Sequence, residues 1–172
     1  MIRQNEKGIA LYVAVMAVST LLIISFSIAD ISYKQQLISY AGRESKIAFY
    51  AADTGLECGL FHDLKVENFF PTSDLPNLSS GVCDGTNFDT QLVNIDGATT
   101  TSVFAFNISN TGGRNACAVV EVTKVMDQPV QDAIKTIITS RGYNNVCDFS
   151  NPTNPNVAAH PRNVERSLEV TY

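Results

Sequence analysis

The chain has 172 residues, enough for one domain plus a membrane segment or for one long domain. Its formal net charge of −5 argues against a nucleic-acid partner bound through general electrostatics. A small local basic patch could still be formed by Arg141, Arg162 and Arg166. Apolar residues are concentrated near the amino terminus, whereas the remainder is rich in Thr, Asn, Ser and Asp.

The first predicted element is an apolar helix over residues 9–29, preceded by a leader peptide over residues 1–8. The run has no charge, proline or glycine, and ~20 apolar residues at ~1.5 Å per residue cross a ~30 Å hydrocarbon core. A secretory signal would have a shorter core and a cleavage site after it. Arg3 and Lys7 in the leader predict a cytoplasmic amino terminus, so the chain after residue 29 is expected outside the cytoplasm.

The helix is predicted to continue to about His62, because residues 9–62 contain no proline. In its second part, small or apolar residues recur every three or four positions and define one helix face. They are Leu37, Ala41, Ser45, Ala48, Ala52, Leu56 and Leu60. With Ala51 and Gly55 nearby, this part has unusually small side chains, which allow another element to approach the backbone closely.

The rest of the chain predicts a loop followed by an antiparallel sheet. Residues 69–89 are rich in loop-forming residues. Alternating residues predict strands at 90–95, 101–109, 116–125, 132–140 and 165–172, with an Asp96-Gly97 turn and a polar loop over 142–161. The sheet should have one apolar and one polar face, with the helix stripe packed on the apolar one. The expected fold class is α+β, with a globular extracytoplasmic domain over 30–172 and the transmembrane half of the helix protruding.

The four cysteines all lie in the predicted extracytoplasmic part. No CxxC pair or cysteine–histidine cluster is present in the sequence, so a zinc site is poorly supported and two disulfides are expected. Three connectivities are possible, and we favour the sequence neighbours Cys58–Cys83 and Cys117–Cys147. Each pair closes a loop for which the chain-entropy estimate is about 3 kcal/mol.

Lys7-Gly8 stands directly before Ile9-Ala10-Leu11 and the apolar run, and residues 49–57 read FYAADTGLE. With these motifs the first sixty positions resemble type IV pilin-like proteins, and residues 49–57 are similar to the helix of minor pilins. The resemblance implies that a prepilin peptidase cuts between Gly8 and Ile9 and that the new amine of Ile9 is methylated. The helix would then leave the membrane and pack with other pilin subunits in a surface filament, where loops contact neighbouring subunits, host surfaces or other cells.

One position departs from the family pattern. Most pilins have glutamate at the fifth position after the cut, where this chain has Val13. In the family, that carboxylate pairs with the terminal amine of a neighbouring subunit in apolar surroundings, where an unpaired charge costs several kcal/mol. The tip pseudopilin of type II secretion systems and some minor pilins share this absence. The resemblance therefore implies a minor or tip-proximal subunit.

No catalytic constellation or cofactor motif is apparent, so we expect a structural protein rather than an enzyme. His62-Asp63 is expected to be a solvated helix cap, and His160 has no partner at ligand spacing. Residues 84–89 have oxygen ligands at calcium-like spacing without the terminal glutamate of a full loop, so a polar turn is expected. The alternative functions are an unprocessed, membrane-anchored extracytoplasmic binding module and a type II secretion pseudopilin.

Overall fold

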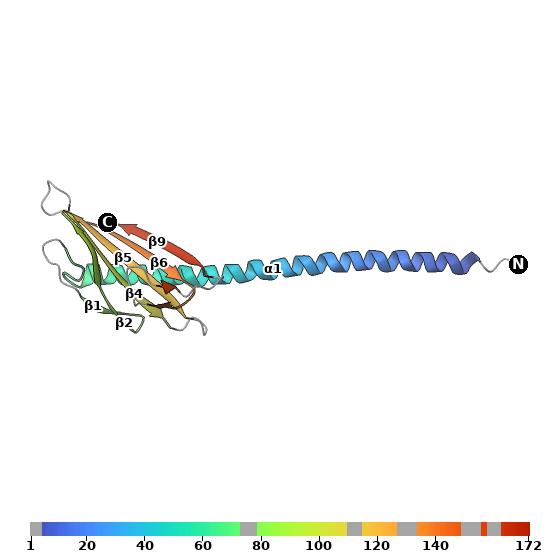
Figure 1. Ribbon diagram of the computed structural model, residues 1–172, viewed down its shortest axis with the longest axis horizontal. Coiled ribbons are helices and arrows are strands. Elements are labelled where there is room, and N and C mark those ends of the chain that lie inside the picture. The colour runs from blue at the N-terminus through green and yellow to red at the C-terminus, as the bar shows by residue number, and fades with distance from the viewer. Residues whose placement is uncertain (1–4, 73–78, 110–114, 127–133, 149–155, 158–162) are drawn as a thin grey trace. The chain divides into compact units, whose positions relative to one another are not determined.

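The computed structural model describes residues 5–72, 79–109, 115–126, 134–148, 156–157 and 163–172 (Figure 1). The chain divides into two compact units, Met1–Gly42 and Arg43–Tyr172. The division falls within α1, so this helix contributes to both units.

The predicted long helix is confirmed as α1, which runs from Asn5 to Lys65. Lys65 lies in its last turn, where a basic group interacts favourably with the carboxyl end of a helix. Glu44 is the first fully buried residue of α1, and Leu37 and Ala41 of the predicted stripe are exposed.

The predicted antiparallel sheet is also confirmed, with five strands in the spatial order β3-β4-β5-β6-β9. The strands are β3 (Gln91–Asp96), β4 (Thr99–Ile108), β5 (Ala116–Met126), β6 (Ile134–Tyr143) and β9 (Glu165–Thr171). Each described strand pairs antiparallel with its neighbour, and β6 extends three residues beyond the predicted end at residue 140. The fold class is α+β, as expected.

The register of β4, β5, β6 and β9 places alternate residues on the face that packs against the second part of α1. Phe104 lies opposite Val120, Val120 opposite Ser140, and Ser140 opposite Leu168 across the four strands β4, β5, β6 and β9. Phe104, Val120 and Ser140 are fully buried. The helix stripe and the apolar sheet face thus form one core, as the sequence predicted.

Small residues set the distance between α1 and this sheet face. A Cβ atom added to Gly55 would lie 2.8 Å from Cβ of Ala118, and one added to Gly142 of β6 would overlap the helix backbone at Ala48 and Ala52. The sheet therefore approaches α1 closely enough to contact its backbone. This confirms the prediction that the small side chains of the helix allow a close approach.

The prediction of a loop over residues 69–89 is wrong in part. Strands β1 (Ser80–Cys83) and β2 (Thr86–Asp89) form a hairpin there. Its turn residues Asp84 and Gly85 have φ of 49° and 73°, the left-handed conformation that a two-residue hairpin requires. Phe88 of β2 reaches the core and stacks on Phe104 with ring centroids 4.3 Å apart. This burial anchors a segment whose composition is otherwise typical of a loop.

The expectation of an entirely polar second sheet face is also wrong. Val103, Cys117 and Val119 are buried on that face with Cys147, which lies in the short strand β7 (Cys147–Asp148). Strand β7 pairs with β8 (Asn156–Val157), so the expected loop over 142–161 contains a small two-stranded sheet. The apolar residues of the second face are covered because a disulfide holds this segment on it.

Candidate functional site: the exposed apolar helix

The first part of α1 presents an apolar surface that no described part of the chain covers. Large side chains between residues 9 and 28 are exposed by 52% (Met16) to 80% (Phe26). They are Ile9, Leu11, Tyr12, Val13, Val15, Met16, Val18, Leu21, Leu22, Ile23, Ile24, Phe26 and Ile28. At ~1.5–3 kcal/mol for fully burying each such side chain, and with each roughly 60% exposed, their exposure to water costs on the order of 10–25 kcal/mol. This surface must therefore be covered by lipid or protein.

The serine and threonine hydroxyls in this run are satisfied within the helix itself. The hydroxyls of Ser19 and Thr20 donate to carbonyls three residues earlier, at 2.9 Å each. Those of Ser25 and Ser27 donate to carbonyls four residues earlier, at 2.8 and 2.9 Å. An unsatisfied donor is costly in hydrocarbon, so this arrangement suits the helix to an apolar environment.

The charges that follow the run neutralise one another. Lys34 donates from Nζ to Oδ2 of Asp30 at 2.8 Å, one helical turn away, and both side chains are exposed. The helix is long and apolar enough to cross a membrane, by length and composition. The sequence prediction of a membrane-spanning segment is supported to that extent, with its polar boundary at this ion pair.

The three residues predicted to govern processing and docking lie at the start of α1. Gly8 and Ile9 belong to its first two turns. Val13 is 58% exposed. Between residues 9 and 29 the sequence supplies no carboxylate, and Asp30 is the first acidic residue after the run.

The cysteines join in the two pairs that the sequence favoured. Cys58 of α1 is bonded to Cys83 of β1, with Cα atoms 6.1 Å apart, and Cys117 of β5 is bonded to Cys147 of β7, with Cα atoms 5.8 Å apart. The first bond ties the β1–β2 hairpin to the helix, and the second ties β7 to the sheet. Both separations are ordinary for disulfides.

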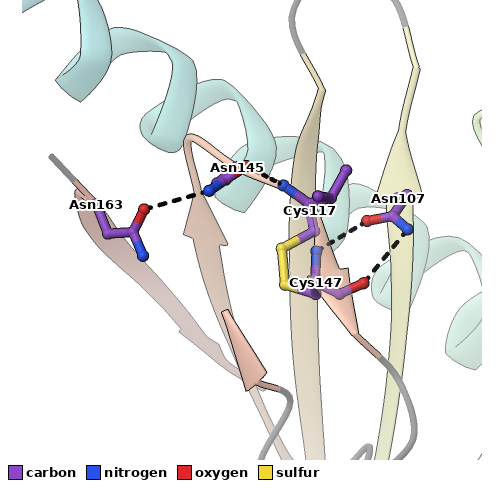
Figure 2. The surroundings of a disulfide bond; sticks show 6 residues. Asn107, Cys117, Asn145, Cys147 and Asn163 are labelled. Atoms are coloured by element: carbon purple, nitrogen blue, oxygen red, sulfur yellow. Dashed lines mark hydrogen bonds between the residues drawn. A yellow bond between two sulfur atoms is a disulfide. The ribbon is translucent and has the colours of Figure 1, made fainter. Parts of the chain in front are cut away.

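The amide of Asn107 reinforces the second disulfide (Figure 2). Its Oδ1 accepts a hydrogen bond from the backbone N–H of Cys147 at 3.1 Å, and its Nδ2 donates to the Cys147 carbonyl at 3.5 Å. Asn145 accepts from the N–H of Val146 and donates to Asn163 near the start of β9. The connection between β6 and β9 is therefore held by side-chain amides as well as by a covalent bond.

The expectation that His62-Asp63 is a solvated cap is wrong. The side chain of His62 is only 7% exposed and lies among aromatic rings, with centroids 4.4 Å from Phe69 and 5.3 Å from Phe88. Its Nδ1 donates to the Cys58 carbonyl at 2.9 Å and lies 3.5 Å from Cys58 Sγ. Sequence reasoning missed this site because Cys83 and Phe88 come from a hairpin that it treated as a loop.

Asp63 takes part in a buried ionic cluster that the sequence did not predict. Lys124 Nζ of β5 lies 2.6 Å from Asp63 Oδ1, and the hydroxyl of Tyr172 donates to Asp63 Oδ2 at 2.7 Å. Burial, together with this hydrogen bond to Asp63, raises the pKa of the Tyr172 phenol above its usual value. The cluster fastens the end of α1 to β5 and to the carboxyl end of the chain.

The calcium alternative does not fit the described hairpin. Asp84 lies in its turn, whereas Asp89 lies at its open end and accepts a hydrogen bond from the Ser80 hydroxyl at 2.6 Å. The two carboxylates are thus separated by the length of β2. His160, the other histidine, lies outside the described residues.

Comparison with known proteins finds no matching protein family, no matching curated protein and no matching solved structure.

Proposed function

We propose that this protein is a structural subunit of a type IV pilus or related filament, minor or tip-proximal, whose mechanism is assembly rather than catalysis. The observation that carries the proposal is the composition of α1. Its first part exposes a continuous apolar surface, and its last part packs through small residues on an antiparallel sheet. A helix of this kind supplies the apolar packing between subunits, and the α+β unit supplies the outer surface.

Before assembly, the helix is held in the cytoplasmic membrane with its amino terminus inside. The basic leader supports this orientation, and the internally satisfied hydroxyls support residence in lipid. A prepilin peptidase then cuts between Gly8 and Ile9, and methylation of Ile9 follows. The partners are thus the peptidase, the membrane and other pilin subunits, and after export the host or cell surfaces that the filament contacts.

Val13 supports a minor or tip-proximal position. An apolar residue here cannot pair with the terminal amine of a neighbouring subunit. No ion pair at this position can therefore align the subunit with one that is already in the filament. A subunit at the tip has no earlier subunit on which to dock and has no need of that carboxylate. A type II secretion pseudopilin at the tip of its filament is the closely related alternative.

The second candidate is an unprocessed, membrane-anchored binding module, because α1 also meets the requirements of a permanent membrane span. Mass spectrometry of sheared surface filaments separates the two. The filament proposal requires a peptide that begins at methylated Ile9, and Gly8→Val should abolish it. Gly42→Ala is the matched control, because a Cβ there meets nothing within 4 Å. Recovery of intact Met1 alone, and only from membranes, would refute the filament proposal.

A further inference from the structure

We propose that Cys58, His62 and Cys83 form a redox-gated binding site for a thiophilic divalent metal ion such as Zn²⁺, closed by the disulfide and opened by its reduction. The ligand atoms of these three residues lie within 4.8 Å of one another. Cys58 and His62 are one helical turn apart on α1, and Cys83 comes from β1.

The spacing fits a tetrahedral thiolate–imidazole site. Zn–S and Zn–N bonds of ~2.3 and ~2.05 Å at a tetrahedral angle place sulfur and nitrogen ~3.6 Å apart. Nδ1 of His62 already lies 3.5 Å from Sγ of Cys58. The two sulfurs need to separate to ~3.8 Å, which rotation of the cysteine side chains can provide over a Cα distance of 6.1 Å.

The surroundings favour capture of a soft metal. Cys83 and His62 are buried and Cys58 is half-buried. A water molecule as fourth ligand would therefore approach from the Cys58 side. The rings of Phe69 and Phe88 fix the imidazole in place. Two thiolates and an imidazole form a donor set that selects Zn²⁺ over hard cations such as Ca²⁺ or Mg²⁺.

The chemistry that opens the site is a two-electron reduction. A dithiol reductant breaks the Cys58–Cys83 bond, becomes a disulfide itself and leaves two protein thiols. Metal binding then releases both thiol protons and forms bonds to the two sulfurs and to Nδ1. The imidazole proton moves from Nδ1 to Nε2, because Nδ1 donates to the Cys58 carbonyl in the oxidised form. Both sulfurs are bonded to each other in that form, so it excludes the metal.

Cobalt titration of the full chain in detergent micelles tests this site. The double variant C117S/C147S leaves Cys58 and Cys83 as the cysteine pair, and a phosphine reductant is removed before titration under argon. We expect one Co²⁺ per reduced chain, with the visible bands of a tetrahedral thiolate site, and none in the oxidised chain. C58S/C83S, which keeps the other cysteine pair, should give no such bands.

His62 variants distinguish a site that includes the imidazole from metal binding by the two cysteines alone. In the C117S/C147S background, His62→Ala should weaken Co²⁺ affinity on the order of tenfold or more, whereas His160→Ala should not change it. His62→Cys should restore tight binding with stronger thiolate charge transfer. The proposal is overturned if the reduced chain binds no Co²⁺, if His62→Ala binds as tightly as its parent, or if binding occurs only after the sheet's circular dichroism is lost.

Discussion

The buried ion pair between Lys124 and Asp63 should be the most sensitive polar contact in the described fold. Their side chains are only 14% and 6% exposed. Lys124→Met keeps most of the side-chain volume but leaves the Asp63 carboxylate with Tyr172 as its described partner. Removing one partner of a buried pair costs about 3–5 kcal/mol, because the remaining charge is desolvated without compensation. We expect Lys124→Met to lower the free energy of unfolding by about 3 kcal/mol.

The double variant Lys124→Met/Asp63→Leu should recover most of that loss. It removes both charges together, and a buried pair replaced by apolar residues is often neutral. Tyr172 is 43% exposed, so its hydroxyl can turn to water once its acceptor is gone. Urea unfolding of the full chain in micelles measures the effect through near-ultraviolet circular dichroism of tyrosine and disulfides, since the chain has no tryptophan.

An exposed pair provides the control. Lys34→Met breaks the Lys34–Asp30 contact, whose side chains are 67% and 55% exposed, and should cost less than ~1 kcal/mol. If Lys124→Met costs as little as this control, or if the double variant is no more stable than Lys124→Met, then the Asp63 carboxylate is solvated in solution and the reasoning from burial fails.

Three further perturbations test the Tyr172 hydrogen bond, the close approach at Gly142 and the second disulfide. Because the pKa of Tyr172 is raised on folding, its hydrogen bond should stabilise the fold fully below pH ~10 and progressively less above it. As the pH is raised above ~10, the unfolding free energy of Tyr172→Phe should therefore fall less than that of the wild type. Gly142→Ala should destabilise by about 1–3 kcal/mol in urea unfolding, because its Cβ overlaps the backbone of α1, whereas Gly42→Ala should be neutral or stabilising by up to ~1 kcal/mol. Replacing Cys117 and Cys147 by serine should lower the unfolding free energy by about 3 kcal/mol, the chain-entropy estimate for their loop; an unchanged urea midpoint would contradict it.

Helices and strands whose apolar or small residues recur at a regular spacing could be predicted from the sequence. The absence of proline and the repeat of small residues predicted α1 to within a few residues at each end. Strict alternation predicted the strands, and the most accurate bounds are those of β5 and β9, whose patterns are clearest. These signals are local, so they do not depend on knowing which segments meet.

The β1–β2 hairpin could not be predicted as easily, although its signal was present. Asp84-Gly85 is a hairpin turn dipeptide, but the flanking strands are only four residues long and are mostly polar or small. Phe88 becomes a core residue only because Phe69, Phe70 and Phe104 gather around it. Such an aromatic cluster is a tertiary property, and the surroundings of His62 depend on it.

The buried polar contacts were missed for a related reason. Asp63 and Lys124 are sixty-one positions apart, and Glu44 and Asn144, whose side chains join at 2.7 Å, are one hundred apart. No local pattern distinguishes these residues from solvated surface charges and amides. Their burial follows from the packing of the helix against β5 and β6, which composition and periodicity do not specify residue by residue.

The polar chemistry of residues 9–29 bears on the proposed transfer from membrane to filament. All four serine and threonine hydroxyls in this run bond to the helix's own carbonyls, so none needs a lipid, water or protein partner. For these four hydroxyls, movement between hydrocarbon and an apolar protein surface breaks no external hydrogen bond. A carboxylate at position 13 would need a counter-charge both in the membrane and in the filament, because an unpaired charge is costly in apolar surroundings. On the proposed function, Val13 brings no such charge at this position, and the contacts of the α+β unit would then set the order of assembly.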